Sequence, residues 1–106
     1  MWFIFPQIAG LGQSPMSIRF AVASLDEAKA YLAHPILGAR LRECAQFTLD
    51  GEVGTAREIF GSIDGMKFRS SMTLFARAAS DEDLFQRCID RYFAGVSDPA
   101  TLAKLE

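Results

Sequence analysis

The sequence has few residues that bind metals or form disulfides. It contains two cysteines, Cys44 and Cys88, and a single histidine, His34. Both cysteines fall on apolar faces of expected helices, which favours free buried thiols over a disulfide. Two thiols and one histidine also lack the paired spacing of zinc ligands. We therefore expect no metal and no cofactor.

Long hydrophobic runs and charge of one sign are absent as well. No stretch approaches the roughly 20 apolar residues of a membrane-spanning helix. Eleven basic and thirteen acidic residues give a formal net charge of −2 and are interleaved, without the basic patch of a nucleic-acid-binding protein. The short apolar start lacks the basic leader and cleavage site of a signal peptide. The sequence thus predicts a soluble cytoplasmic protein that binds neither nucleic acid nor membranes.

The composition is that of one globular domain. Half of the 106 residues are hydrophobic, 11% are aromatic and 23% are charged. This length supports one core and is too short for two domains. We expect residues 1–106 to form a single helical domain.

The chain begins with an unusually hydrophobic segment. Five large apolar residues, from Met1 to Phe5, precede Pro6. Burying such side chains is worth roughly 1.5–3 kcal/mol each, so they must pack in this domain, against a partner, or against a segment ahead of Met1. We favour the third arrangement, in which the native protein has a longer N-terminus.

Helical patterns fill most of the remaining sequence. Capping residues and apolar side chains three or four positions apart predict helices over residues 14–23, 24–33, 35–49, 62–79 and 80–94, with short turns over 55–60 and 97–105. An alternating strand pattern competes only in residues 2–5. We predict an all-α fold, a compact bundle of five to six short helices with an extended or irregular N-terminal segment.

Start and stop signals set the expected helix boundaries. Ser24 and Glu27 form a capping box, and Ser80 and Asp83 suggest a second one. Gly61 is expected to end a short turn before the longer helix begins.

The apolar stripes of these helices define the expected core. The stripe of the third helix comprises Leu37, Leu41, Cys44 and Thr48. Over the whole chain we expect mostly buried side chains at Leu41, Phe60, Phe68, Phe75, Phe85, Ile89 and Tyr92.

Three segments resemble a known bacterial family. They are M-W-F-I-F-P-Q…G-L-G at 1–12, S-L-D-E-A-K-A-Y-L-A-H-P-I-L-G-A-R-L at 24–41 and F-G-S-I-D-G-M-K-F-R-S-S-M-T-L-F at 60–75. On these segments the chain resembles domain-of-unknown-function family 1810, whose members are mainly helical and have no established activity. Members usually carry a further helical segment ahead of the position of Met1, which implies that this chain lacks it.

The family is often labelled "calpastatin", a class of calpain inhibitors. Those inhibitors are long flexible chains rich in Pro, Ser and Lys. A half-apolar chain with periodic faces does not fit that class, because it should fold on its own.

The first place with residues suited to binding is a glycine turn. Gly10 and Gly12 lead into a helix at Ser14 and Pro15, and free N–H groups at a helix start attract anions. However, Pro15 stands where a dinucleotide fingerprint has its third glycine, and no strand clearly precedes the turn. We interpret this turn as a capped helix start.

The second place is the helix expected from residue 62. Asp64, Lys67 and Ser71 lie on one strip beside the face of Phe68 and Phe75. Such residues usually tie a helix to its neighbour. The alternatives are a Lys–Ser pair that binds an anion or, less expected, a nucleophile. The order of Lys67 and Ser71 differs from the S-x-x-K motif of acyl-transfer enzymes, so catalytic residues stay unassigned.

The third place is His34, at the corner before Pro35. A histidine there usually bonds a free carbonyl at the helix end, and acid–base chemistry would need a carboxylate or substrate close by. Trp2 and Gln7 are interpreted first as a core anchor and a loop residue that forms hydrogen bonds.

Two classes of function remain open. In the first, the domain binds a small anionic or nucleotide-like ligand in a cleft. A loose similarity of pattern to helical proteins that handle NAD and ADP-ribose derivatives favours this class. The candidate ligand-binding residues are Trp2, Gln7, His34, Lys67 and Ser71. In the second, the chain is a non-enzymatic module whose apolar N-terminal edge, Met1–Phe5, contacts a partner or a second copy in a homodimer. Whether any reaction is catalysed stays undecided.

Overall fold

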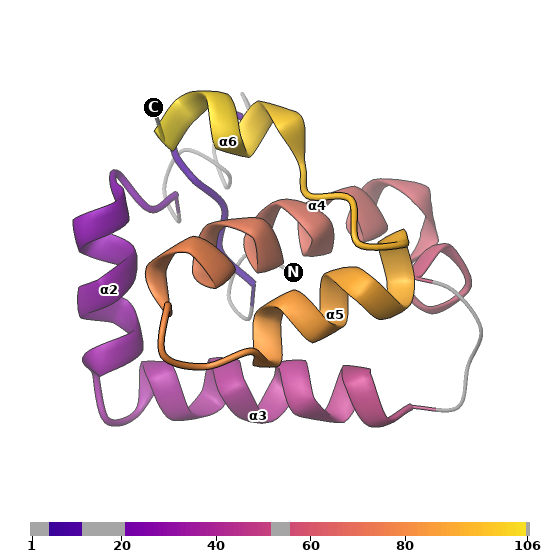
Figure 1. Cartoon of the computed structure of the whole chain (residues 1–106), viewed down its shortest axis with the longest axis horizontal. Helices are drawn as coiled ribbons and strands as arrows, with labels where there is room; N and C mark the ends of the chain where they lie inside the picture. The colour runs from indigo at the N-terminus through magenta and orange to yellow at the C-terminus, as the bar shows by residue number, and fades with distance from the viewer. Residues whose placement is uncertain (1–4, 12–20, 52–55, 106) are drawn as a thin grey trace.

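The chain folds into α-helices connected by short loops. The computed structural model describes residues 5–11, 21–51 and 56–105, with the backbone alone over 56–64. Within these ranges the helices, labelled as in Figure 1, are α2 (Leu25–Ala33), α3 (Leu37–Asp50), α4 (Ala56–Ala78), α5 (Leu84–Phe93) and α6 (Pro99–Leu105). The described residues form one isolated parallel bridge, between Ile8 and Val22. The predicted all-α fold is confirmed.

Helix α4 lies at the centre of the bundle. It packs against α2, α5 and α6, and α3 packs against α2 and α5. Figure 1 shows α5 in front of α4, α3 along one side and α6 along the opposite side. The radius of gyration is 12.5 Å, close to the ~13 Å of a compact domain of about 100 residues.

The core lies mainly between α4 and α5. Phe68 and Phe75 of α4 and Phe85 and Ile89 of α5 are completely buried, and the rings of Phe75 and Phe85 are 5.8 Å apart. These four positions and Leu41 are buried as predicted, whereas Tyr92 is only half-buried. The prediction for Phe60 lies outside the described side chains.

Helix α4 runs on where the sequence predicts a break. It is continuous over 23 residues, so the predicted stop at Gly61 is wrong. A glycine inside a helix costs only about 1 kcal/mol relative to alanine. Burial of the aromatic face that follows outweighs that local cost.

The stripe of α3 is rotated by one position from the expected one. Leu41 is buried as predicted, but Leu37 is 39% exposed, while Gly38, Ala45 and Leu49 are buried. The other two predicted members, at positions 44 and 48, are half-buried. A Cβ added at Gly38 would lie 2.1 Å from the carbonyl oxygen of the last turn of α2. Only glycine allows this approach, and it fixes which face of α3 points inward.

The two predicted capping boxes have different outcomes. At α2, Ser24 Oγ accepts a hydrogen bond from the Glu27 N–H at 3.2 Å, and Glu27 Oε2 accepts one from the Ala23 N–H at 3.0 Å. The Ser24 cap is therefore confirmed. At α5 the second box is wrong, because Asp83 is the N-cap and its side chain makes no capping hydrogen bond. Helix α5 consequently begins at Leu84, later than predicted.

The N-terminal segment forms a parallel bridge at Ile8 and turns at Ala9 and Gly10. The Val22 N–H donates to the Gln7 carbonyl and the Ala9 N–H donates to the Val22 carbonyl, both at 2.7 Å. These bonds exclude helix at Val22, so the predicted extension of the first helix to Ala23 is wrong. The rest of that helix prediction, including Ser14 and Pro15, lies outside the described residues.

Asp98 attaches the last helix to α4. Its Oδ2 accepts hydrogen bonds from Ser70 Oγ at 3.0 Å and from the Thr101 N–H and hydroxyl at 3.1 and 2.6 Å. Its own N–H donates to Thr73 Oγ1 at 2.9 Å. Asp98 therefore caps α6 and holds it on α4 at once.

Candidate functional site

Among the described residues, Ser71 carries a buried polar atom without a hydrogen-bond partner. Its side chain is 0% exposed, and its Oγ finds no hydrogen-bond partner in the described part of the chain. Neighbouring hydroxyls on α4 bond back to the preceding turn, Ser70 to the Met66 carbonyl at 3.0 Å and Thr73 to the Arg69 carbonyl at 2.8 Å. A buried hydroxyl without a partner costs about 1–3 kcal/mol, so Ser71 requires an explanation.

Lys67 and Ser71 lie on the stretch of α4 that the N-terminal segment contacts through Phe5. Lys67 precedes Ser71 by one helical turn and is half-buried. Between them, Phe68 packs edge-on against Phe5, with ring centroids 4.9 Å apart. Phe5 anchors the N-terminal segment on this stretch of α4, and the half-buried Gln7 follows two residues later in the sequence.

His34 caps the start of α3 at the corner between α2 and α3. Its Nδ1 accepts hydrogen bonds from the N–H groups of Ile36 and Leu37, both at 3.1 Å, and its carbonyl accepts one from Gly38 at 2.9 Å. The imidazole therefore caps the start of α3, with its proton on Nε2. The expectation that this side chain bonds a free carbonyl is corrected.

The structure separates His34 from the pair on α4. Ala33, the residue before His34, and Ala78, at the end of α4, line one hollow on the surface. His34 therefore lies near the C-terminal end of α4. Lys67 precedes Ala78 by eleven residues, which is roughly 16 Å along a helix axis. Of the five candidate residues, Lys67 and Ser71 lie one turn apart on α4, and His34 lies apart from them. Trp2 is outside the described residues, and a place for Gln7 beside Lys67 and Ser71 stays a prediction.

That hollow is a feature that the sequence analysis missed. It measures about 190 Å³ and is lined by Lys29, Leu32, Ala33, Arg42, Ala78, Ala79 and Asp81. No local signal marks it, because its residues come from three helices and the loop after α4.

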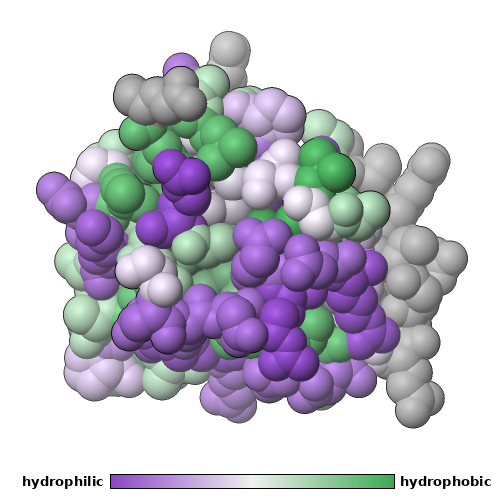
Figure 2. Space-filling view, in the orientation of Figure 1, coloured by the Kyte–Doolittle hydropathy of each residue, from purple (hydrophilic) through white to green (hydrophobic). Residues whose placement is uncertain are grey.

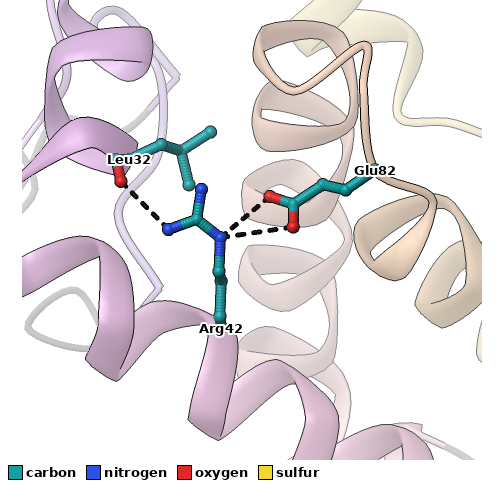
Figure 3. Close-up of polar contacts among 3 residues, drawn as sticks. All are labelled: Leu32, Arg42 and Glu82. Atoms are coloured by element: carbon teal, nitrogen blue, oxygen red, sulfur yellow. Dashed lines mark hydrogen bonds and ion pairs between the residues drawn. The ribbon is translucent and has the colours of Figure 1, made fainter.

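Arg42 bridges three elements beside the hollow. Its Nε donates to both carboxylate oxygens of Glu82, at 2.9 and 3.2 Å, and its Nη1 donates to the Leu32 carbonyl at 3.0 Å. Figure 3 shows the guanidinium held between the end of α2 and the loop that leads to α5. The guanidinium thus satisfies a carbonyl at the end of α2 and is fixed in position.

The two thiols are free, as predicted. Cys88 is buried and its Sγ donates to the Ala45 carbonyl at 3.5 Å. Burial raises the pKa of the Cys88 thiol to about 12, so it stays protonated at neutral pH and is a poor nucleophile. Cys44 is half-buried.

The described residues include neither a metal-binding cluster nor a membrane-spanning helix. Over residues 5–11, 21–51 and 56–105, no group of three or more His, Cys, Asp or Glu side chains is placed to hold a metal ion. No helix in the same ranges is both long enough and apolar enough to cross a membrane.

The glycine turn and the N-terminal edge are described only in part. Gly10 has a φ of +95°, and a Cβ there would lie 3.1 Å from the Lys104 side chain of α6. Phe5 is 4% exposed, so this residue of the apolar edge belongs to the core of its own domain. Residues 1–4 and Gly12 lie outside the described residues.

Comparison with known proteins places the chain in a family. Its structure is similar to that of the conserved hypothetical protein Rv1873 from Mycobacterium tuberculosis, with a TM-score of 0.96 and 45% sequence identity, over 98% of this chain and 74% of that one. None of the curated proteins compared matches it. The family model described as "Protein of unknown function (DUF1810)" matches residues 1–105. The chain therefore belongs to this family, as its sequence segments indicate.

Proposed function

We propose that the domain binds a small anionic ligand on the side of α4 that carries Lys67 and Ser71, next to the segment of Phe5 and Gln7. The supporting observation is the Ser71 hydroxyl, which is fully buried and unpaired among the described residues. A ligand oxygen that accepts a hydrogen bond from this hydroxyl would explain why the position is polar. Without a ligand, alanine would pack equally well and would leave no buried donor unpaired.

Each residue would contribute one interaction. The Lys67 ammonium supplies positive charge, the Ser71 hydroxyl donates one hydrogen bond, and the Gln7 amide donates another. A phosphate or a nucleotide-like compound offers the matching oxygens. The site contains no activated nucleophile among the described residues, so the proposal is binding and assigns no reaction. Trp2 stays a predicted contact, and a cytoplasmic location stays part of this proposal.

The first test is a thermal-shift screen with inorganic phosphate, ADP, ADP-ribose and NAD. A ligand present at 100 times its Kd stabilises the folded state by about 2.7 kcal/mol, which shifts Tm by several degrees. We expect at least one of these probes to raise Tm of the parent protein, and Ser71→Ala to remove that shift.

The stability of Ser71→Ala without ligand is part of the same test. Removing an unpaired buried hydroxyl should leave the protein as stable or raise its stability by about 1 kcal/mol or more. If none of the probes shifts Tm, or if Ser71→Ala responds to them like the parent, the proposal fails.

A further inference from the structure

We propose that the hollow beside Arg42 is a second binding site, for a small zwitterion of amino-acid size. It is formed where α2 and α4 both end, since the last residue of each helix, Ala33 and Ala78, lines it. None of the residues that line this site belongs to the Lys67–Ser71 strip. The two sites can therefore be tested separately.

The cationic side of the hollow is suited to a carboxylate. Arg42 uses Nε and Nη1 on Glu82 and Leu32, while its Nη2 makes no hydrogen bond within the described ranges. Lys29, exposed on α2, lines the same hollow. A guanidinium fixed by two partners can offer its remaining N–H groups to a ligand carboxylate with little loss of entropy.

The negative charge on the other side of the hollow comes from Asp81 and from the C-terminal ends of two helices. A helix C-terminus carries partial negative charge, because its last carbonyls lack partners within the helix. Two such ends meet here, and the exposed Asp81 lines the same space. Together these groups favour an ammonium group close to the carboxylate site.

The balance of charge selects a neutral ligand with two charged ends. Lys29 and Arg42 supply two positive charges, and Asp81 and Glu82 supply two negative ones, of which Glu82 is already paired with Arg42. A dianion would meet Asp81 and two helix C-termini, and a simple cation would meet Lys29 and Arg42. A zwitterion satisfies both sides.

The volume and the lining set the size of the ligand. A hollow of about 190 Å³ corresponds to roughly six water molecules at ~30 Å³ each. That space suits a ligand of about the size of an amino acid. Leu32, Ala78 and Ala79 provide apolar surface for a small side chain.

The test is a titration followed by two-dimensional amide NMR, with L-alanine, acetate and methylammonium as probes at millimolar concentration. We expect L-alanine to shift the amide signals of Ala33, Ala79 and Asp81. Acetate carries only the carboxylate of the amino acid, and methylammonium carries only its ammonium group. Each should bind at least about tenfold more weakly than L-alanine, because each loses one charge-assisted hydrogen bond.

Two rim variants keep the test independent of folding. Lys29→Met and Asp81→Asn remove exposed charges and should leave Tm unchanged, yet each should weaken L-alanine binding about tenfold. Lys104→Met and Asp26→Asn, at exposed positions outside the hollow, are the matched controls and should bind L-alanine normally.

Three results would overturn the inference. Equal binding of acetate and L-alanine would indicate a simple anion site, and normal binding by Asp81→Asn would remove the ammonium contact. If no probe shifts these signals, the hollow is only a gap between helix ends. None of these outcomes depends on Lys67 or Ser71, so failure here is distinguishable from failure of the proposed function.

Discussion

A single side chain, His34, caps the start of α3 at the corner that joins α2 to α3. Its Nδ1 accepts the N–H groups of Ile36 and Leu37, which have no carbonyl partner in the first turn of a helix. Pro35, which lies between His34 and Ile36, lacks an N–H, so the imidazole and the proline together account for the first turn.

We predict that His34→Ala destabilises the protein by about 1 kcal/mol, the usual cost of losing a side-chain N-cap. His34→Asn should recover most of that loss, because an asparagine side-chain oxygen can accept the same N–H groups. Urea denaturation of the three proteins measures both effects. If His34→Ala is as stable as the parent, the imidazole does not cap α3.

At the scale of elements, the contact between α2 and α3 depends on a glycine. A Cβ at Gly38 would lie 2.1 Å from the Leu32 oxygen and 2.8 Å from its carbonyl carbon. The same carbonyl accepts the hydrogen bond from Arg42, so the close approach and the arginine contact belong to one junction.

We predict that Gly38→Ala costs about 1–3 kcal/mol, the range for overpacking at a tight contact. The matched control is Gly51→Ala, where the nearest atom to an added Cβ is 3.4 Å away and φ is −61°. That change should be neutral or stabilising by up to about 1 kcal/mol. Equal Tm values for the two variants would show that α2 and α3 can separate without cost.

The same junction shows why sequence predicts some elements better than others. The buried faces of α4 and α5 follow from helical periodicity alone, because a stripe such as Phe68, Met72 and Phe75 is local information. The face of α3 depends on Gly38 meeting Leu32, and that packing contact is not encoded in the apolar pattern of α3.

Helix boundaries and sites depend on contacts between distant parts of the chain. Glu82 bonds Arg42, forty positions away, in the loop where the sequence predicts helix. Lys67 and Ser71 were identifiable from their spacing on α4, but Arg42 was not, since its partners come from other elements. The Ser71 hydroxyl could be recognised as unpaired only once its neighbours in space were known.

At the scale of the whole molecule, the described surface is mostly hydrophilic on one side. Figure 2 shows hydrophilic side chains over α5 and the loop before it, and hydrophobic ones beside α6. Phe47 of α3 is 82% exposed, but Gln46, Asp50 and Glu43 occupy the same exposed part of that helix. Isolated apolar residues of this kind are normal on a protein surface.

Global stability should depend on the packing of α4 against α5. Phe85 is completely buried and lies against Phe75. We predict that Phe85→Ala costs about 3–5 kcal/mol, a large part of the 5–15 kcal/mol that holds a typical domain folded. Guanidinium denaturation measures the loss. A value below about 1 kcal/mol would mean that this face is not the core.

If Lys67 and Ser71 bind an anionic ligand, Lys67→Met should lose that ligand, and a binding titration of this variant measures the loss directly. The probe is whichever of phosphate, ADP, ADP-ribose and NAD gives the largest thermal shift, and the control is Arg87→Met, which removes an exposed cation of α5 outside both sites. We expect Lys67→Met to lose binding while its Tm without ligand stays within a few degrees of the parent, and Arg87→Met to bind normally. Binding that survives Lys67→Met, or a large fall in its Tm without ligand, would make Lys67 a structural residue and contradict the claim.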